Sequence, residues 1–230
     1  MRWRADNQQA DKGDVAIIVD VLRACTNLVT AFSMGAKRCK VSVDVGEARR
    51  LAGTTDAILI GERHNEKMEG FDYGNSPLEL EQQKIENSTI IFTSTNFPHA
   101  LSAAGQASYV LLGALVNLSA VCERALSLAI RSDSNIALML AGELCQSYAV
   151  EDYYFAARAS TILSTSCVVD ASAQKAINAA GNRSKQDIIS LSLHARELID
   201  AGFEADVRYA FVIDKFDIVP RLVQGWIVAD

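Results

Sequence analysis

The stretch VAIIVDVLRACTNLVTAFS, residues 15–33, decides the fold of this 230-residue chain. Its first five residues, Val15–Val19, are apolar without alternation, and that pattern is typical of a strand buried on both faces of a sheet. From Thr26 onward the apolar residues fall at helical spacing, and Gly35 is a natural C-cap for that helix. The stretch therefore predicts a strand, a polar loop and a helix.

The same alternation recurs along the chain. Apolar runs that end in polar or small residues occur at 57–60, 89–92, 109–112 and 135–140. Helical patterns follow most of these runs, as expected for a sheet covered by helices on both faces. We predict an α/β protein with a three-layer α/β/α sandwich and a mixed, largely parallel sheet. Residues 1–230 are expected to form a single domain, either as one unit or as two halves that share the sheet.

Composition argues against several classes of function. A net charge of −6 and a pI near 5.1 argue against nucleic-acid or anionic-membrane partners, because both require a basic face. No apolar run approaches the roughly 20 residues of a membrane span, and the N-terminus lacks the apolar core of a signal peptide. Five cysteines without CxxC spacing favour reduced thiols. We expect a cytoplasmic protein and, because half of its residues are hydrophobic, a homo-oligomer.

Carboxylates fall repeatedly in predicted loops, at strand ends or at a helix start: Asp20, Glu62, Asp72, Glu151 and Asp152. Magnesium suits them, because proteins hold it with one or two carboxylates while waters and phosphate oxygens complete the octahedron. Arg23 and Arg63 follow two of these acids and offer a fork-shaped clamp for phosphate. Metal and arginines together support hydrolysis of a phosphate ester. The alternative is a structural ion pair between Asp20 and Arg23.

Other polar residues lie near these acids in the sequence. Hydroxyl and amide groups come from Thr26, Asn75, Ser76, Thr95 and Asn96. Cys25 lies beside the predicted helix N-terminus and an arginine, which would lower its thiol pKa, and this leaves a cysteine nucleophile as an alternative. For the histidines His64, His99 and His194, which lack metal-binding spacing, a surface or packing role is favoured over metal ligation.

Several motifs together resemble the 2-phosphosulfolactate phosphatase family between about residues 15 and 220. They are DVLRACTNLVTAFSMGA (20–36), GERHNEKMEGFDYGNSPLEL (61–80), TSTNFPHAL (93–101), GALVN (113–117) and the pair Glu151 and Asp152. The most specific element is GER followed by GFDYGNSP. The resemblance implies an α/β sandwich and a magnesium-dependent phosphatase that converts 2-phosphosulfolactate and water to sulfolactate and phosphate. Its partner would be a small anionic phosphorylated substrate.

The resemblance also implies roles for individual residues. Catalytic roles fall to Asp20, Arg23, Glu62, Arg63 and Asn96. Substrate binding falls to Thr26, Asn75, Ser76, Thr95 and His99, and metal ligation to Asp20, Asp72, Glu151 and Asp152.

The chain departs from the family pattern mainly at small and cationic positions. Cys25 and Asn27 replace Thr or Ser, Phe97 replaces glycine, His99 stands at a basic position, and Gln146-Ser147 replaces Gly-Arg. The family's N-terminal strand is also curtailed. Each lost charge-assisted hydrogen bond costs about 1.5–3 kcal/mol. We therefore predict that 2-phosphosulfolactate is a poor substrate and that esters with a neutral or less charged tail are preferred. The competing hypotheses are a degenerate homologue that binds an anionic metabolite without catalysis, and a structural or partner-binding protein.

Overall fold

The strand predicted at Val15–Val19 lies inside one parallel half of a large sheet. The computed structural model describes residues 1–142 and 147–229. Strand β2 (Val15–Val19) pairs in parallel with β7 (Tyr109–Gly113) on one side and with β8 (Ile136–Leu140) on the other. Beyond β8 follow β1 (Arg2–Asp6) and the short β9 (Val168–Val169), also parallel. This half places the carboxyl ends of β2 and β8 side by side.

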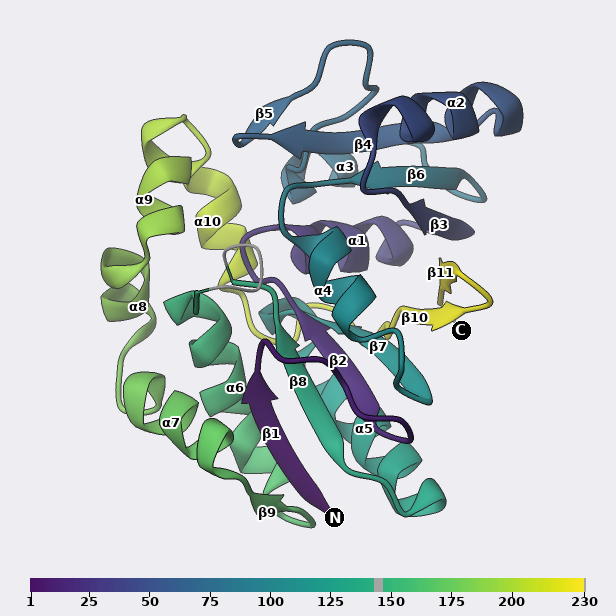
Figure 1. Cartoon of the computed structure of the whole chain (residues 1–230). Helices are drawn as coiled ribbons and strands as arrows, with labels where there is room; N and C mark the ends of the chain where they lie inside the picture. Colours follow the sequence, from purple (N-terminus) through teal and green to yellow (C-terminus); the bar gives the residue numbers. More distant parts are fainter. Residues whose placement is uncertain (143–146, 230) are drawn as a thin grey trace.

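The second half of the sheet is also parallel within itself. Strands β4 (Ile58–Arg63), β6 (Thr89–Thr93) and β3 (Arg38–Val41) lie next to one another. The short β5 (Glu66–Lys67) turns back antiparallel to β4 at the edge. In Figure 1 the strands of the first half run at a steep angle to β4 and β6.

A C-terminal hairpin joins the two halves. Strands β10 (Arg221–Val223) and β11 (Trp226–Val228) pair antiparallel to each other. Arg221 pairs with Leu111 in β7, and Ile227 pairs with Cys39 in β3. The full strand order is β5-β4-β6-β3-β11-β10-β7-β2-β8-β1-β9. The described sheet is therefore mixed but largely parallel, as predicted.

Helices cover both faces of the sheet (Figure 1). One face packs against α5 (Leu118–Ser132), α6 (Val150–Leu163) and α7 (Ala171–Ala180), with the 3₁₀ turn η1 (Leu115–Asn117) before α5. The other face packs against α1 (Ala24–Ser33), α3 (Pro77–Glu81) and α4 (Phe97–Ala103), and α2 (Val45–Thr55) covers the far side of β4 and β6. Along β2, Val15, Ile17 and Val19 enter one core while Ala16 and Ile18 enter the other. This two-sided burial explains the unbroken apolar run and confirms the α/β/α prediction.

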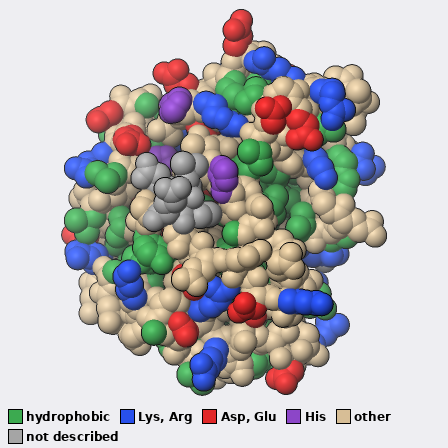
Figure 2. All heavy atoms as spheres, viewed as in Figure 1, with side chains coloured by type: hydrophobic (Ala, Val, Ile, Leu, Met, Phe, Trp, Pro, Cys, Tyr) green, Lys and Arg blue, Asp and Glu red, His purple; other side chains and the backbone are tan. Residues whose placement is uncertain are grey.

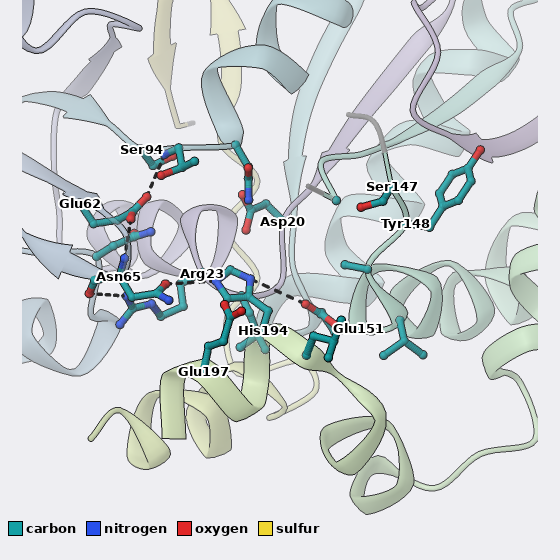
Figure 3. A pocket seen from close by; sticks show the side chains of 18 of the residues that line it. Asp20, Arg23, Glu62, Asn65, Ser94, Ser147, Tyr148, Glu151, His194 and Glu197 are labelled. Atoms are coloured by element: carbon teal, nitrogen blue, oxygen red, sulfur yellow. Dashed lines mark hydrogen bonds and ion pairs between the residues drawn. The ribbon is translucent and has the colours of Figure 1, made fainter. Parts of the chain in front are cut away.

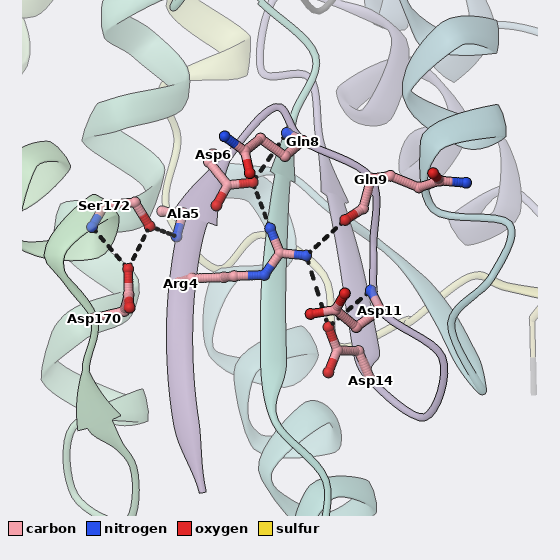
Figure 4. Close-up of polar contacts among 9 residues, drawn as sticks. All are labelled: Arg4, Ala5, Asp6, Gln8, Gln9, Asp11, Asp14, Asp170 and Ser172. Carbon is pink, nitrogen blue, oxygen red and sulfur yellow. Dashed lines mark hydrogen bonds and ion pairs between the residues drawn. The ribbon is translucent and has the colours of Figure 1, made fainter.

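The N-terminal strand β1 was not identified from the sequence pattern. Arg4 holds it in place, because its guanidinium bonds Asp6 and the carbonyl oxygen of Gln9 and lies 3.7 Å from Asp14 (Figure 4). The backbone N–H of Ala5 donates to the Ser172 hydroxyl at the start of α7. The sheet therefore begins at residue 2.

Residues 185–200 form two helices rather than one continuous helix. Helix α8 (Lys185–Leu191) ends at Ser192, whose backbone is extended, and α9 (Leu193–Asp200) starts directly afterwards. The buried Ser192 hydroxyl accepts a hydrogen bond from the backbone N–H of Ala195 and so caps α9. A third helix, α10 (Glu204–Ala210), follows. Figure 1 shows α9 beside the tip of β4.

Two further features concern the surface and the thiols. Within the described ranges, no helix is long and apolar enough to span a membrane. Basic and acidic side chains are interspersed on the face drawn in Figure 2. The described cysteines Cys25, Cys39, Cys122 and Cys167 are buried and free, and Cys145 lies outside the described residues.

Candidate active site

Polar side chains from four strand ends line one cavity of about 600 Å³. Asp20 follows β2, Glu62 lies near the end of β4, and Glu151 lies in the first turn of α6, which comes after β8. Asn75, Thr95, Asn96 and Arg23 also line it. In Figure 3, Glu62 and Ser94 lie on one side of Asp20 and Ser147 and Tyr148 on the other, while His194 and Glu197 approach from α9. The structure thus brings together seven of the residues predicted from the sequence.

Asp20 lies at the centre of this cavity with only 6% of its surface exposed. One carboxylate oxygen accepts a hydrogen bond of 3.1 Å from the backbone N–H of Ala24 at the start of α1. Burial and, to a smaller extent, the negative charges of Glu62 and Glu151 raise the pKa of Asp20 to about 7, although the hydrogen bond from Ala24 and the charge of Arg23 act to lower it. A proton or a cation would therefore be favoured here at neutral pH.

Glu62 links two loops that form one wall of the cavity. Its Oε1 accepts from the backbone N–H of Thr95 at 2.8 Å, and its Oε2 accepts from the backbone N–H of Asn65 at 3.0 Å. The first bond fixes the loop after β6, and the second fixes the turn between β4 and β5. Glu62 remains on the cavity surface while it orders both segments.

Arg23 is a buried cation with its own counter-ion. Its Nη1 donates to Asp206 of α10 at 2.9 Å, and its Nη2 donates to the carbonyl oxygen of Asn65 at 3.2 Å. The guanidinium also lies 4.4 Å from the centre of the Phe203 ring. Burial lowers the pKa of Arg23. The alternative of an Asp20–Arg23 ion pair is not what the structure shows, because Arg23 pairs with Asp206 instead.

Asp152 lies beneath the cavity rather than on its lining. Its two carboxylate oxygens accept from the backbone N–H groups of Val21 at 3.0 Å and Gly142 at 3.1 Å. Burial raises its pKa well above the ordinary range, and the charges of Glu151 and Asp20 add to that effect. Asp152 therefore joins the loop after β2 to the loop after β8. Its predicted role as a metal ligand stays a prediction.

Five other predicted residues do not line the cavity: Thr26, Arg63, Asp72, Ser76 and His99. The buried Thr26 hydroxyl donates to the Val21 carbonyl, and Arg63 bonds the carbonyls of Glu62 and Val43 and the Thr93 hydroxyl. Asp72 is exposed and accepts from the N–H of Leu59 near the start of β4, the end opposite Glu62. Ser76 caps α3 and donates to Asp206, and His99 is exposed. Thr26, Arg63, Asp72 and Ser76 therefore hold loops and helix ends.

Lining residues without a role assigned from the sequence include Ser94, Asn65 and His194. The Ser94 hydroxyl is buried and has no hydrogen-bond partner within the described chain, and the same holds for Oδ1 of Asn75. His194 of α9 lies with Nε2 3.2 Å from Oδ1 of Asn65 and with Nδ1 3.9 Å from Oε1 of Glu151. Ser94 was detectable because it belongs to the polar TSTN run. Asn65 belongs to the GERHNEKMEG run after β4. No local signal marks His194, because α9 reaches the site only through the tertiary fold.

The structure contradicts the alternative of a reactive Cys25. Its thiol is completely buried in α1, and Sγ lies 3.3 Å from the carbonyl oxygen of Ile18. Burial raises the pKa of Cys25 well above its ordinary value, and the charge of Asp20 raises it further. A protonated, enclosed thiol is a poor nucleophile.

The donor set of the cavity suits a hard cation. Across residues 1–142 and 147–229, no group of three or more His, Cys, Asp or Glu side chains is arranged to hold a metal ion. Magnesium needs only one or two protein carboxylates, and Asp20, Glu62 and Glu151 all line the cavity. The pKa of Asp20 is raised mainly by burial, and the charges of Glu62 and Glu151 add to that effect, so ionised Asp20 would be stabilised by a bound cation. The chemistry of these side chains therefore fits Mg²⁺.

Comparison with known proteins gives a consistent match over nearly the whole chain. A family model described as 2-phosphosulpholactate phosphatase matches residues 3–225. A protein of Caldanaerobacter subterraneus subsp. tengcongensis named "Probable 2-phosphosulfolactate phosphatase" is 33% identical, over 97% of this chain and 93% of that protein. Proteins with the same name from Thermotoga petrophila and Deinococcus radiodurans are 34% and 33% identical. They cover 91% and 92% of this chain and 89% of their own length.

Proposed function

The chain belongs to the 2-phosphosulfolactate phosphatase family, and we propose that it is a magnesium-dependent phosphatase that hydrolyses a small anionic phosphomonoester. Hydrolysis of such an ester breaks the bond between phosphorus and the ester oxygen and yields an alcohol and inorganic phosphate. A cytoplasmic location and a homo-oligomeric state stay predictions.

The charge of the cavity carries this proposal. Asp20, Glu62, Glu151 and Glu197 line it, whereas Arg23 is the single lysine or arginine among its described lining residues. Arg23 is already paired with Asp206. A phosphate dianion would be repelled by such a surface unless a divalent cation were bound with it. Excess carboxylate at a phosphatase site therefore supports a metal-dependent reaction.

The residues that would hold Mg²⁺ are the cavity carboxylates Asp20, Glu62 and Glu151. When bound, the ion would polarise a phosphoryl oxygen and activate water. The backbone bonds to Ala24, Thr95 and Asn65 hold Asp20 and Glu62 in fixed positions before substrate arrives. Fixed charges of this kind need no reorganisation during the reaction.

Other lining residues supply contacts to the phosphate. Ser94 and Asn75 each present a buried polar atom without a partner within the described chain, and a ligand or water would satisfy both. Arg23 lines the cavity in a position set by Asp206 and Phe203, and its charge is already paired with that of Asp206. The predicted substrate contacts of Thr95 and Asn96 are supported by their place on the cavity lining.

Phosphate release from a panel of phosphomonoesters tests the proposal. Purified protein should release phosphate with Mg²⁺ and lose this activity in EDTA, and adding back Mg²⁺ should restore it. A protein that binds these esters with Mg²⁺ but releases no phosphate from any of them would be a degenerate homologue. A protein that binds neither Mg²⁺ nor an ester would be the structural alternative.

A further inference from the structure

Two exposed leucines line the cavity together with the carboxylates. We infer that Leu191 and Leu193, called here the leucine wall, bind an apolar tail of the substrate, so that the preferred phosphomonoester carries an alkyl rather than a sulfonate or other anionic tail. This inference rests on the proposed phosphatase function and adds the substrate class.

The leucine wall faces solvent although it belongs to the site. Leu191 is 48% and Leu193 70% exposed, and both line the same cavity as Asp20. They flank Ser192, where α8 ends and α9 begins. Because the backbone of Ser192 is extended, the residues on either side of it both line the cavity. Large exposed apolar groups beside a reaction centre are suited to cover an apolar part of a ligand.

Contacts of α9 fix the leucine wall relative to the reaction centre. His194, next to Leu193, lies 3.2 Å from Asn65 and 3.9 Å from Glu151, and Glu62 holds the backbone of Asn65. The position of α9 is therefore tied to two of the three cavity carboxylates. We place the phosphate near Asp20 and the tail at Leu193, which lines the same cavity.

Charge at this wall disfavours an anionic tail. Glu197 lies in α9 four residues after Leu193 and also lines the cavity. Arg23 is the sole lysine or arginine among the described lining residues, and Asp206 neutralises it. Among the described lining residues, a sulfonate would lose its hydration there without gaining a lysine or arginine that is not already paired.

The cavity has room for such a tail. Its volume of about 600 Å³ falls within the roughly 300–1,000 Å³ that is usual for small-molecule sites. An alkyl chain of a few carbons attached to the phosphate would extend from the carboxylates toward α9. An apolar contact of this kind discriminates by roughly tenfold or more.

Binding of two phosphonates by calorimetry in the presence of Mg²⁺ tests the inference. Butylphosphonate and 3-sulfopropylphosphonate share the head group, differ in tail charge, and cannot be hydrolysed, so binding is measured independently of turnover. The wild-type protein should bind butylphosphonate roughly tenfold more tightly. Leu193→Arg should reverse this preference by about tenfold, because it adds a cation to the wall. Ile130→Arg, at a 57% exposed helix position away from the cavity, should leave the preference unchanged.

The outcomes separate this inference from the proposed function. Equal or tighter binding of 3-sulfopropylphosphonate by wild-type protein would overturn the apolar tail and leave the phosphatase intact. Failure of Leu193→Arg, folded by circular dichroism, to change the ratio would show that the wall does not contact the tail. If neither phosphonate binds while phosphate esters are hydrolysed, the tail inference alone fails. If neither binds and no ester is hydrolysed, both fail.

Discussion

Replacing Asp20 by asparagine is expected to stabilise the metal-free protein at pH 8 while it abolishes phosphate release. Burial and the neighbouring charges of Glu62 and Glu151 raise the pKa of Asp20 from an ordinary value of 3.8 to about 7. In the folded state, ionisation of this carboxyl is therefore costly. Asparagine resembles the neutral form and can still accept the hydrogen bond from Ala24.

The magnitude follows from the two pKa values. The difference between 3.8 and about 7 corresponds to at most about 4 kcal/mol in the free energy of unfolding. Structural relaxation and water entry lower such penalties. Half of this value, about 2 kcal/mol, would raise Tm by roughly 4–8 °C in a chain of this size.

The sign of the pH dependence is also fixed. Because the pKa of Asp20 is raised in the folded state, its ionisation lowers the free energy of unfolding. This loss of stability is absent below about pH 4 and complete above about pH 7. The Tm difference between Asp20→Asn and wild type, measured in EDTA, should therefore grow from near zero at pH 4 to its full value at pH 8. Asp217→Asn, at an exposed carboxylate, is the control and should show no such trend. Equal Tm values at pH 8, or a difference independent of pH, would refute the reasoning.

Three further predictions concern residues around the cavity. Arg23→Lys should lower the free energy of unfolding, measured by urea denaturation, by about 2–4 kcal/mol and should also reduce kcat. Lysine cannot reproduce the bonds to Asp206 and Asn65 or the contact with Phe203. Unchanged stability would contradict this prediction. Ser76→Ala should lower the free energy of unfolding by about 2–3 kcal/mol, because the α3 cap and the bond to Asp206 are lost, and should leave KM little changed. A higher KM at constant stability would instead indicate that Ser76 contacts the substrate. Cys25 should resist alkylation in the native protein, as measured by mass spectrometry, because its thiol is buried. The rate of phosphate release by Cys25→Ala should lie within a few-fold of the wild-type rate.

The strands that the sequence predicted best are those buried on both faces. Val15–Val19 matches β2 residue for residue, because each of its side chains enters one of the two cores. Strand β1 has the sequence RWRAD, in which charged residues alternate with apolar ones over a short length, and it resembles a surface segment. Its pairing with β8 joins parts of the chain more than 130 residues apart. No local sequence pattern predicts a pairing between segments so far apart.

Residue type predicted which side chains were polar and near a strand end, but not which way each one points. Glu62 and Arg63 are neighbours, yet Glu62 lines the cavity while Arg63 bonds the Val43 carbonyl and the Thr93 hydroxyl. Asp72 follows a long loop and returns to the start of β4 rather than to its end. Gln146, named as a departure from the family, lies outside the described residues, whereas Ser147 lines the cavity.

The dependence of phosphate release on Mg²⁺ in wild type and Glu151→Gln tests the central claim most directly. Glu151 is buried on the cavity lining, and glutamine keeps its size while removing its charge. With a phosphomonoester that the wild type hydrolyses, we expect activity to saturate with Mg²⁺, and Glu151→Gln to need at least about tenfold more Mg²⁺ or to be inactive. Glu123→Gln, at an exposed position of α5, should match the wild type. Phosphate release that persists in EDTA, or an unchanged Mg²⁺ requirement in Glu151→Gln, would contradict a metal-dependent reaction at these carboxylates.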